Sequence, residues 1–283
     1  MLLSGCSKVA EQIRCGERDP KTGQVVFDKK AFSAGSVSYH GISFVFDSSL
    51  GEIAAETRCA VTDLGKGVFY EYHPEHPAFV FNGSYADQQK DSFFSTPEIR
   101  VYRVDEYQKI VGQNAELKRF VEAGFERLRD VLDKQPTSFI HSAPFVAILE
   151  AGQLFYAKVK YVNFQNGKGI LYLTYFCREA WGGCRINNQA LSYIFQGLSD
   201  DGRYFIHGTF PIKANFLPLS ETLSGDSGCF DPLPGATSEE ISQSCEMYGR
   251  QIGEKVEALP STDFEPPLAL FDQLFKSLSI TSP

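Results

Sequence analysis

The chain has 283 residues, a formal net charge of −8, and an apolar fraction of 43% beside a charged fraction of 22%. This length allows one large domain or two small ones, and the composition is that of an ordinary globular protein, which excludes a disordered chain. The acidic balance argues against a nucleic-acid partner, because proteins that neutralise phosphates carry a concentrated basic surface. No run of about 18 apolar residues is available to cross a bilayer as a helix.

The first residues, Leu3, Ser4, Gly5 and Cys6, resemble the bacterial lipobox. The resemblance implies that a lipid is attached to Cys6 and that it anchors the protein to a membrane outside the cytoplasm, in the periplasm or on the cell surface. A charged start and an apolar stretch of about 7 to 15 residues do not fit into five residues, so we expect a longer native precursor. The alternative is a chance match in a cytosolic protein. Residues 1–35 are predicted to be the lipobox remnant and a tether, with ordered structure starting near Ser36.

The chain contains seven cysteines, and setting Cys6 aside leaves six. An even number suits three disulfides in an oxidising compartment. Proximity in the sequence predicts the pairs Cys177–Cys184 and Cys229–Cys245, which leaves Cys15 to pair with Cys59. A structural zinc site would need closely spaced cysteine pairs of the C-x-x-C type, and none occurs. The motifs H-E-x-x-H, P-loop and G-x-G-x-x-G are also missing from the sequence, and we expect no metal and no cofactor.

The first predicted elements are strands. Apolar residues alternate over 37–46, with Gly41 as a possible bulge, and further strands are expected near 56–62, 78–82 and 98–104. A helix is predicted from the N-cap Asn114 to a point before Pro136. Its apolar face has helical spacing and consists of Leu117, Phe120, Val121, Gly124, Leu128, Val131 and Leu132.

Residues 154–212 predict a four-stranded antiparallel meander. Asn166-Gly167 lies between two alternating apolar runs, which is a strong signal for a hairpin. The stretch 199–202, Ser-Asp-Asp-Gly, separates a second such pair of runs. The meander is expected to form the central part of the sheet.

The C-terminal part predicts a long loop and two helices. Residues 216–236 are rich in Pro, Gly and Ser, and Thr237 with Glu240 fits a capping box that begins a helix. One face of that helix is expected to consist of Ile241, Cys245, Tyr248, Ile252 and Val256. A last helix is predicted to start near Pro267 and to bury Leu268, Phe271, Leu274, Phe275 and Leu278.

This order of elements indicates an α+β fold in which residues 36–283 form a single domain, with helices packed on an antiparallel sheet. The stretches "YHGISFVFDSSLG" and "LFDQLFKSLSI" are similar to the first strand and the last helix and strand of PsbP-like proteins. That resemblance implies an antiparallel sheet sandwiched by helices. The sequence differs from that family at Asp47-Ser48. The stretch "FQGLSDDGRYFIHGTFPI" resembles uncharacterised bacterial lipoproteins, which implies a location but no activity.

A catalytic serine is the first candidate for chemistry. "GDSGC", residues 225–229, resembles the nucleophile segment of trypsin-like proteases, in which Ser227 would attack the substrate. Cys229 replaces the next glycine of that motif, and the segment that supplies the general base is missing. A turn beside a disulfide explains the same residues. An exported hydrolase would need Ser227 close to His141 or His207 with a carboxylate behind the imidazole.

A metal site is the second candidate. "YHPEHPAF" contains His73, Glu75 and His76, all residue types that bind metals. The two prolines at positions 74 and 77 favour the simpler interpretation, a surface turn that enters a strand.

A binding loop is the third candidate. A disulfide between Cys177 and Cys184 would present Trp181, with Arg178 and Arg185 nearby, and Trp and Arg are enriched at interface hot spots. The alternative is that Trp181 folds back over the end of the sheet. Because every catalytic motif lacks a required partner, we expect a non-enzymatic binding or accessory protein, anchored through Cys6, with a possible protein partner at the cell envelope. An exported hydrolase with a serine nucleophile is the alternative.

Overall fold

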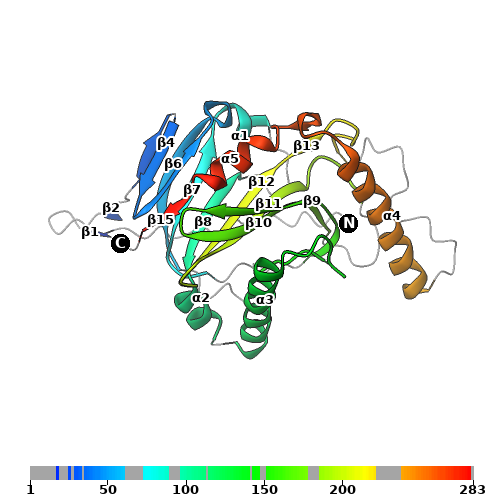
Figure 1. Ribbon diagram of the computed structural model, residues 1–283, viewed down its shortest axis with the longest axis horizontal. Helices are drawn as coiled ribbons and strands as arrows, with labels where there is room; N and C mark the ends of the chain where they lie inside the picture. Colours follow the sequence, from blue (N-terminus) through cyan, green and yellow to red (C-terminus); the bar gives the residue numbers. More distant parts are fainter. Residues whose placement is uncertain are drawn as a thin grey trace, which may run out of the picture.

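The computed structural model describes residues 29–33, 35–60, 73–88, 96–112, 114–140, 142–146, 151–177, 185–220 and 237–281, together with the backbone of β1 (Glu17–Arg18) and β2 (Val25–Val26). Its centre is an antiparallel eight-stranded sheet (Figure 1). In spatial order the strands are β3 (Lys29–Phe32), β6 (Glu52–Arg58), β7 (His76–Asn82), β8 (Glu98–Arg103), β12 (Tyr204–Pro211), β11 (Leu191–Ser199), β10 (Gly167–Cys177) and β9 (Gly152–Phe164). The predicted α+β class is confirmed.

Smaller elements surround this sheet. A three-stranded sheet is formed by β4 (Gly35–Tyr39), β5 (Ile42–Phe46) and β15 (Ser279–Ile280), and β13 (Lys213–Ala214) pairs with β14 (Phe264–Glu265). The helices are α1 (Ser84–Gln88), α2 (Val104–Val111), α3 (Ala115–Lys134), α4 (Ser238–Ala258) and α5 (Ala269–Lys276), with short 3₁₀ turns at Ser48–Leu50 and Ser261–Asp263.

The predicted meander is confirmed as β9 to β12, and it forms one half of the sheet, with β9 at the edge. The loop between β9 and β10 contains Gln165 and Asn166, because Gly167 already pairs with Phe164. A Cβ at Gly167 would lie 2.2 Å from the Phe164 ring. This glycine therefore makes room for an aromatic ring rather than forming the turn.

Two predictions for the N-terminal part need correction. Residues 37–46 are not one bulged strand but the hairpin β4–β5, whose turn is His40 (φ 45°) and Gly41 (φ 70°). Two successive positive φ angles are typical of the tight turns that match strand twist. Ordered structure also begins before Ser36, since β3 pairs with β6 inside the range assigned to the tether. In addition, β6 starts at Glu52 rather than near residue 56.

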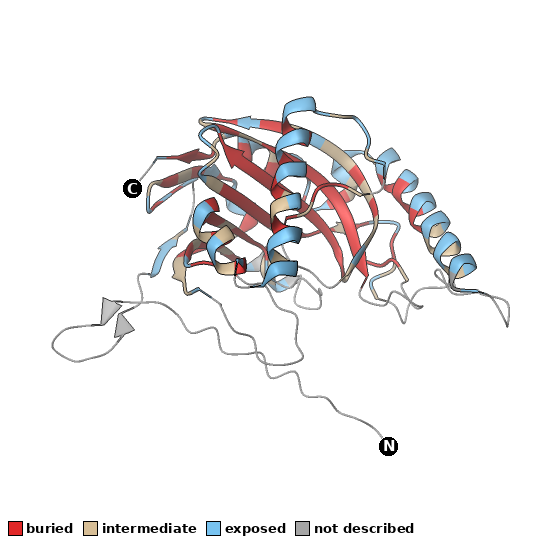
Figure 2. Cartoon of the chain, turned by 90° about the horizontal axis from the view of Figure 1, so that it is seen from below, coloured by how far each residue is buried: buried red, intermediate tan, exposed pale blue. Residues whose placement is uncertain are grey.

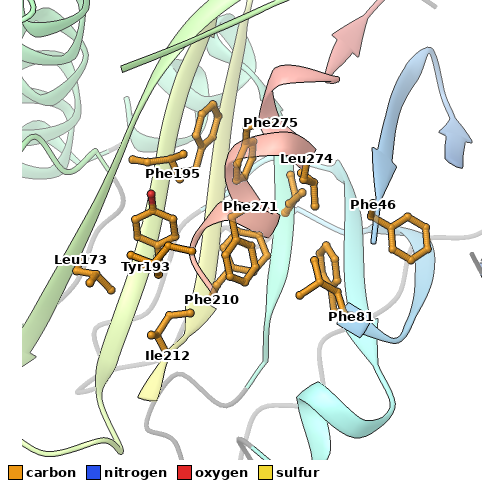
Figure 3. Close-up of a cluster of buried hydrophobic side chains, with 14 of the residues drawn as sticks. Phe46, Phe81, Leu173, Tyr193, Phe195, Phe210, Ile212, Phe271, Leu274 and Phe275 are labelled. Atoms are coloured by element: carbon orange, nitrogen blue, oxygen red, sulfur yellow. The ribbon is translucent and has the colours of Figure 1, made fainter. Parts of the chain in front are cut away.

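The sheet separates two apolar layers. One lies between the sheet and the elements α5 and β4–β5, and it includes Phe195 and Phe275, whose rings stack 3.7 Å apart (Figure 3). The other lies between the sheet and helices α2 and α3. Helix α3 crosses this second face with its outer side exposed (Figure 2). Burial on both faces agrees with β10 and β11, in which nearly every residue is buried.

The helix predictions hold with one change. Asn114 caps α3 by accepting from the backbone N–H groups of Glu116 and Leu117. Phe120, however, is 51% exposed, and Phe125 is the fully buried aromatic residue of this helix. The Thr237–Glu240 capping box starts α4, and all five apolar residues predicted for the last helix are buried.

Helix α4 covers the edge strand β9. Gly249 and Gly253 face this strand, and a Cβ at Gly249 would lie 2.3 Å from the carbonyl oxygen of Leu154. Lys158, with a φ of 55°, lies at a bulge in β9, and its ammonium group donates to the Leu259 carbonyl just after the helix. A cation at this position also interacts favourably with the helix dipole. The helix therefore covers part of an edge that would otherwise be available for pairing.

Candidate functional site

A cleft of about 610 Å³ lies at the end of the sheet where β8 leads into α2. Its apolar lining includes Ile42 of β5, Val101 of β8 and Ile280 of β15. The hairpin turn on one side is fixed to the C-terminal strand, since Thr281 donates its backbone N–H to the Gly41 carbonyl over 2.7 Å. Volumes of roughly 300–1,000 Å³ are usual for small-ligand pockets.

Charges of both signs line the cleft. Arg103 and Lys109 contribute positive charge, and Glu75 and Glu106 contribute negative charge. The guanidinium of Arg103 lies 2.8 Å from Asp105 and 3.5 Å from Glu106. The cleft therefore suits a ligand that has both apolar and polar parts, and its field does not select one sign of charge.

One wall of the cleft is the segment Pro74–Pro77, which enters β7. In the ladder between β6 and β7, Thr57 pairs with Pro77 and Arg58 pairs with His76. Side chains alternate between the two faces of a sheet. Thr57 and Pro77 therefore face the cleft, on the side of the β4–β5 hairpin, and Arg58 and His76 face the layer under α3. The wall thus has a second, buried side.

A buried ion-pair cluster lies on this second side. The Glu98 carboxylate contacts two guanidinium groups: its Oε1 accepts from Arg100 Nε over 2.6 Å, and its Oε2 lies 2.7 Å from Arg58 Nη1. The second contact is an ion pair without hydrogen-bond alignment. Glu56 pairs with Arg58 over 3.1 Å. The side chains of Arg58, Glu98 and Arg100 are only 11%, 7% and 12% exposed, so this is an interior network of two cations and two anions.

Two histidines complete the cluster. The Nδ1 atoms of His73 and His76 lie 3.1 and 2.8 Å from the same acceptor, the carbonyl oxygen of Pro74. Since a carbonyl only accepts, both Nδ1 atoms carry a hydrogen. The second nitrogen of His76, Nε2, is buried and has no hydrogen-bond partner among the described residues. Burial, His73 and the guanidinium groups of Arg100 and Arg58 hold the pKa of His76 well below its usual value, so its Nε2 bears a free lone pair at neutral pH.

The interpretation of this segment as a surface turn is wrong for both histidines, because His73 is 2% and His76 1% exposed. A metal ion is also disfavoured here. Among the described residues no group of three or more His, Cys, Asp or Glu side chains is placed to hold one. The same guanidinium groups that oppose a proton on His76 would oppose a metal cation.

The predicted hydrolase site falls mostly outside the described residues, which include neither Ser227 nor His141. His207 is described and buried, its Nε2 lies 3.0 Å from the hydroxyl oxygen of Thr209, and its ring packs against Phe145. The proposed contact between Ser227 and a histidine therefore stays a prediction.

Three of the predicted disulfide cysteines, Cys59, Cys177 and Cys245, are described, and each is disulfide-bonded. Cys6, Cys15, Cys184 and Cys229 lie outside the described residues. The side chains of Cys177 and Cys245 belong to one small cluster with Leu154 and Tyr248. This contact fits two neighbouring bridges, Cys177–Cys184 and Cys229–Cys245, and equally a direct Cys177–Cys245 bond, so the pairing stays a prediction.

The predicted binding loop is only partly described. Trp181 and Arg178 lie outside the described residues. Arg185 is half-buried, and its carbonyl accepts from the Tyr175 hydroxyl over 3.1 Å and from Asn187 Nδ2 over 2.7 Å. The backbone at the end of the loop is thus fixed to the sheet, and the role of Trp181 stays a prediction.

No family model, no curated protein and no solved structure matches this chain. The resemblances to PsbP-like proteins and to bacterial lipoproteins therefore stay predictions. Within the described parts of the chain, no helix is long and apolar enough to cross a membrane.

Proposed function

We propose that the protein is an extracytoplasmic, lipid-anchored binding or accessory protein whose ligand occupies the cleft beside α2. The observation that carries this proposal is the cleft itself, which combines an apolar lining with charges of both signs in a volume usual for small ligands. Binding requires only such a shaped surface. The nucleophile of the alternative, a serine hydrolase, is Ser227, which lies outside the described residues.

Binding in the cleft is tested with 8-anilinonaphthalene-1-sulfonate, a fluorescent probe that has apolar rings and one charge. Ile110 of α2 lines the cleft, and Ile110→Trp would fill part of it. Ile140 is 94% exposed and lines a different groove beside α4, so Ile140→Trp is a matched control. We expect Ile110→Trp to weaken probe binding at least about tenfold, a loss of about 1.4 kcal/mol, and Ile140→Trp to leave it unchanged. The reverse result would assign binding to the groove beside α4.

Anchoring is tested separately. The lipobox-like residues Leu3 to Cys6 support it, and an oxidising compartment agrees with the disulfide-bonded state of Cys59, Cys177 and Cys245. In the native host, mass spectrometry should find an acylated N-terminal peptide that begins at Cys6, and Cys6→Ser should leave the membrane fraction. A mature protein that still begins with an unmodified Met1 would overturn the anchor.

A further inference from the structure

The histidines pack the wall Pro74–Pro77 on the sheet through Tyr102 and close the wall onto itself through the Pro74 carbonyl. Neither proline has a backbone N–H, so the wall has fewer donors for the ladder with β6 than an ordinary strand. Instead, the imidazole of His76 packs on the ring of Tyr102 with centroids 4.4 Å apart, and its Nδ1–H closes onto the Pro74 carbonyl. His73 packs edge-on against His76 at 4.6 Å and donates to the same carbonyl.

The charged groups around His76 make protonation of its Nε2 unfavourable. Arg58 and Glu56 face it from β6, Arg100 and Glu98 face it from β8, and His73 lies beside it on its own segment. Both oxygens of Glu98 already contact guanidinium groups. A proton on Nε2 would add a positive charge to a balanced interior cluster and a donor to a buried position where no described residue accepts a hydrogen bond.

We propose that His76 is an acid-sensitive latch: its protonation releases the segment Pro74–Pro77 from the sheet and opens one wall of the cleft. The latch is a property of the fold. Only its consequence, weaker retention of a ligand in acid, rests on the proposed function.

The direction and size of the effect follow from linkage. The pKa of His76 is depressed in the closed state and returns to about 6.5 when the segment is released to water. Opening therefore becomes easier as the pH falls below about 6.5 and does not change above it. If protons bind only the open form, the equilibrium constant for opening rises about 30-fold between pH 8 and pH 5.

Amide hydrogen exchange of the full chain, corrected for the intrinsic effect of pH, tests this without any ligand. We expect the peptide that covers residues 73–82 to exchange at least about tenfold faster at pH 5 than at pH 8, while the peptide of β11 changes little. His76→Asn, which keeps a donor near the position of Nδ1 but does not titrate, should abolish the difference. His73→Asn is the matched control and should retain it.

Three results would overturn the latch: no acceleration of residues 73–82, equal acceleration of β11, or an unchanged effect in His76→Asn. If His76→Asn does not fold, nitrogen NMR of the wild-type imidazoles decides the question. The latch requires a neutral His76 protonated at Nδ1 at pH 7, and an Nε2–H form would contradict it. Because exchange is measured without the probe, failure of the latch is distinguishable from failure of probe binding in the cleft.

Discussion

The two faces of the central sheet are buried in different ways. The face under α5 and the β4–β5 hairpin is closed by aromatic and aliphatic side chains, including the stacked pair Phe195 and Phe275. The face under α2 and α3 is apolar near Phe125 but also holds the cluster of Arg58, Glu98 and Arg100. The apolar face is explained by the free energy of burial alone. The cluster is not, since a buried ion pair is seldom more stabilising than apolar residues of the same size.

The largest expected effect lies on the apolar face. Phe195 is fully buried, and its ring contacts Phe164 as well as Phe275. Phe195→Ala should lower the free energy of unfolding by about 3–5 kcal/mol, because the loss of a fully buried ring leaves a cavity beside Phe164 and Phe275. Denaturant titration measures the change. Phe120→Ala, at a position 51% exposed, is the matched control and should cost less than about 1 kcal/mol.

The second expected effect tests whether the ion-pair cluster stabilises the face under α2 and α3. Glu98→Gln removes the charge that pairs with Arg58 and Arg100, which leaves Glu56 as the one anion of this cluster beside two interior guanidinium groups, and it should cost about 3 kcal/mol. The combined replacement Arg58→Met, Glu98→Leu and Arg100→Met, made together with Glu56→Gln so that no carboxylate of the cluster is left without its guanidinium, should instead be nearly neutral or stabilising. If the combined variant loses as much stability as Glu98→Gln, the cluster supports the fold and our comparison of the two faces is wrong.

A third, smaller effect tests how closely the apolar face is packed. A Cβ at Gly169 would lie 2.3 Å from the Phe195 ring, whereas no atom of the described residues lies within 4 Å of a Cβ at Gly152. Gly169→Ala should therefore cost about 2 kcal/mol through displacement of that ring, within the range of about 1–3 kcal/mol for overpacked cores. Gly152→Ala should have no measurable cost. Equal melting temperatures for the two variants would show that Phe195 can move aside.

Much of the fold follows from local signals, and the site does not. Alternating apolar residues and the Asn114 cap predicted the meander and α3, because these patterns act within a few residues. The turn at His40–Gly41 was missed because a glycine inside an alternating pattern also fits a bulge. In "EIRVYR", residues 98–103, the charged side chains alternate with apolar ones, which is the usual pattern of a strand with one solvated face. Only the packing of other elements determines that Glu98 and Arg100 are buried instead.

The smallest expected effect concerns how the covering helices are held. The Asn114 side chain accepts from two backbone N–H groups at the start of α3, whereas the first turn of α5 has no side-chain cap. Asn114→Ala should therefore cost about 1 kcal/mol. Helix α5 depends on its buried residues Phe271 and Phe275 instead. Hydrogen exchange should show the loss in the first turn of α3 and leave α5 unchanged. Equal loss of protection in both helices would mean that the two faces unfold together, and that the sheet couples them more tightly than their separate coverings imply.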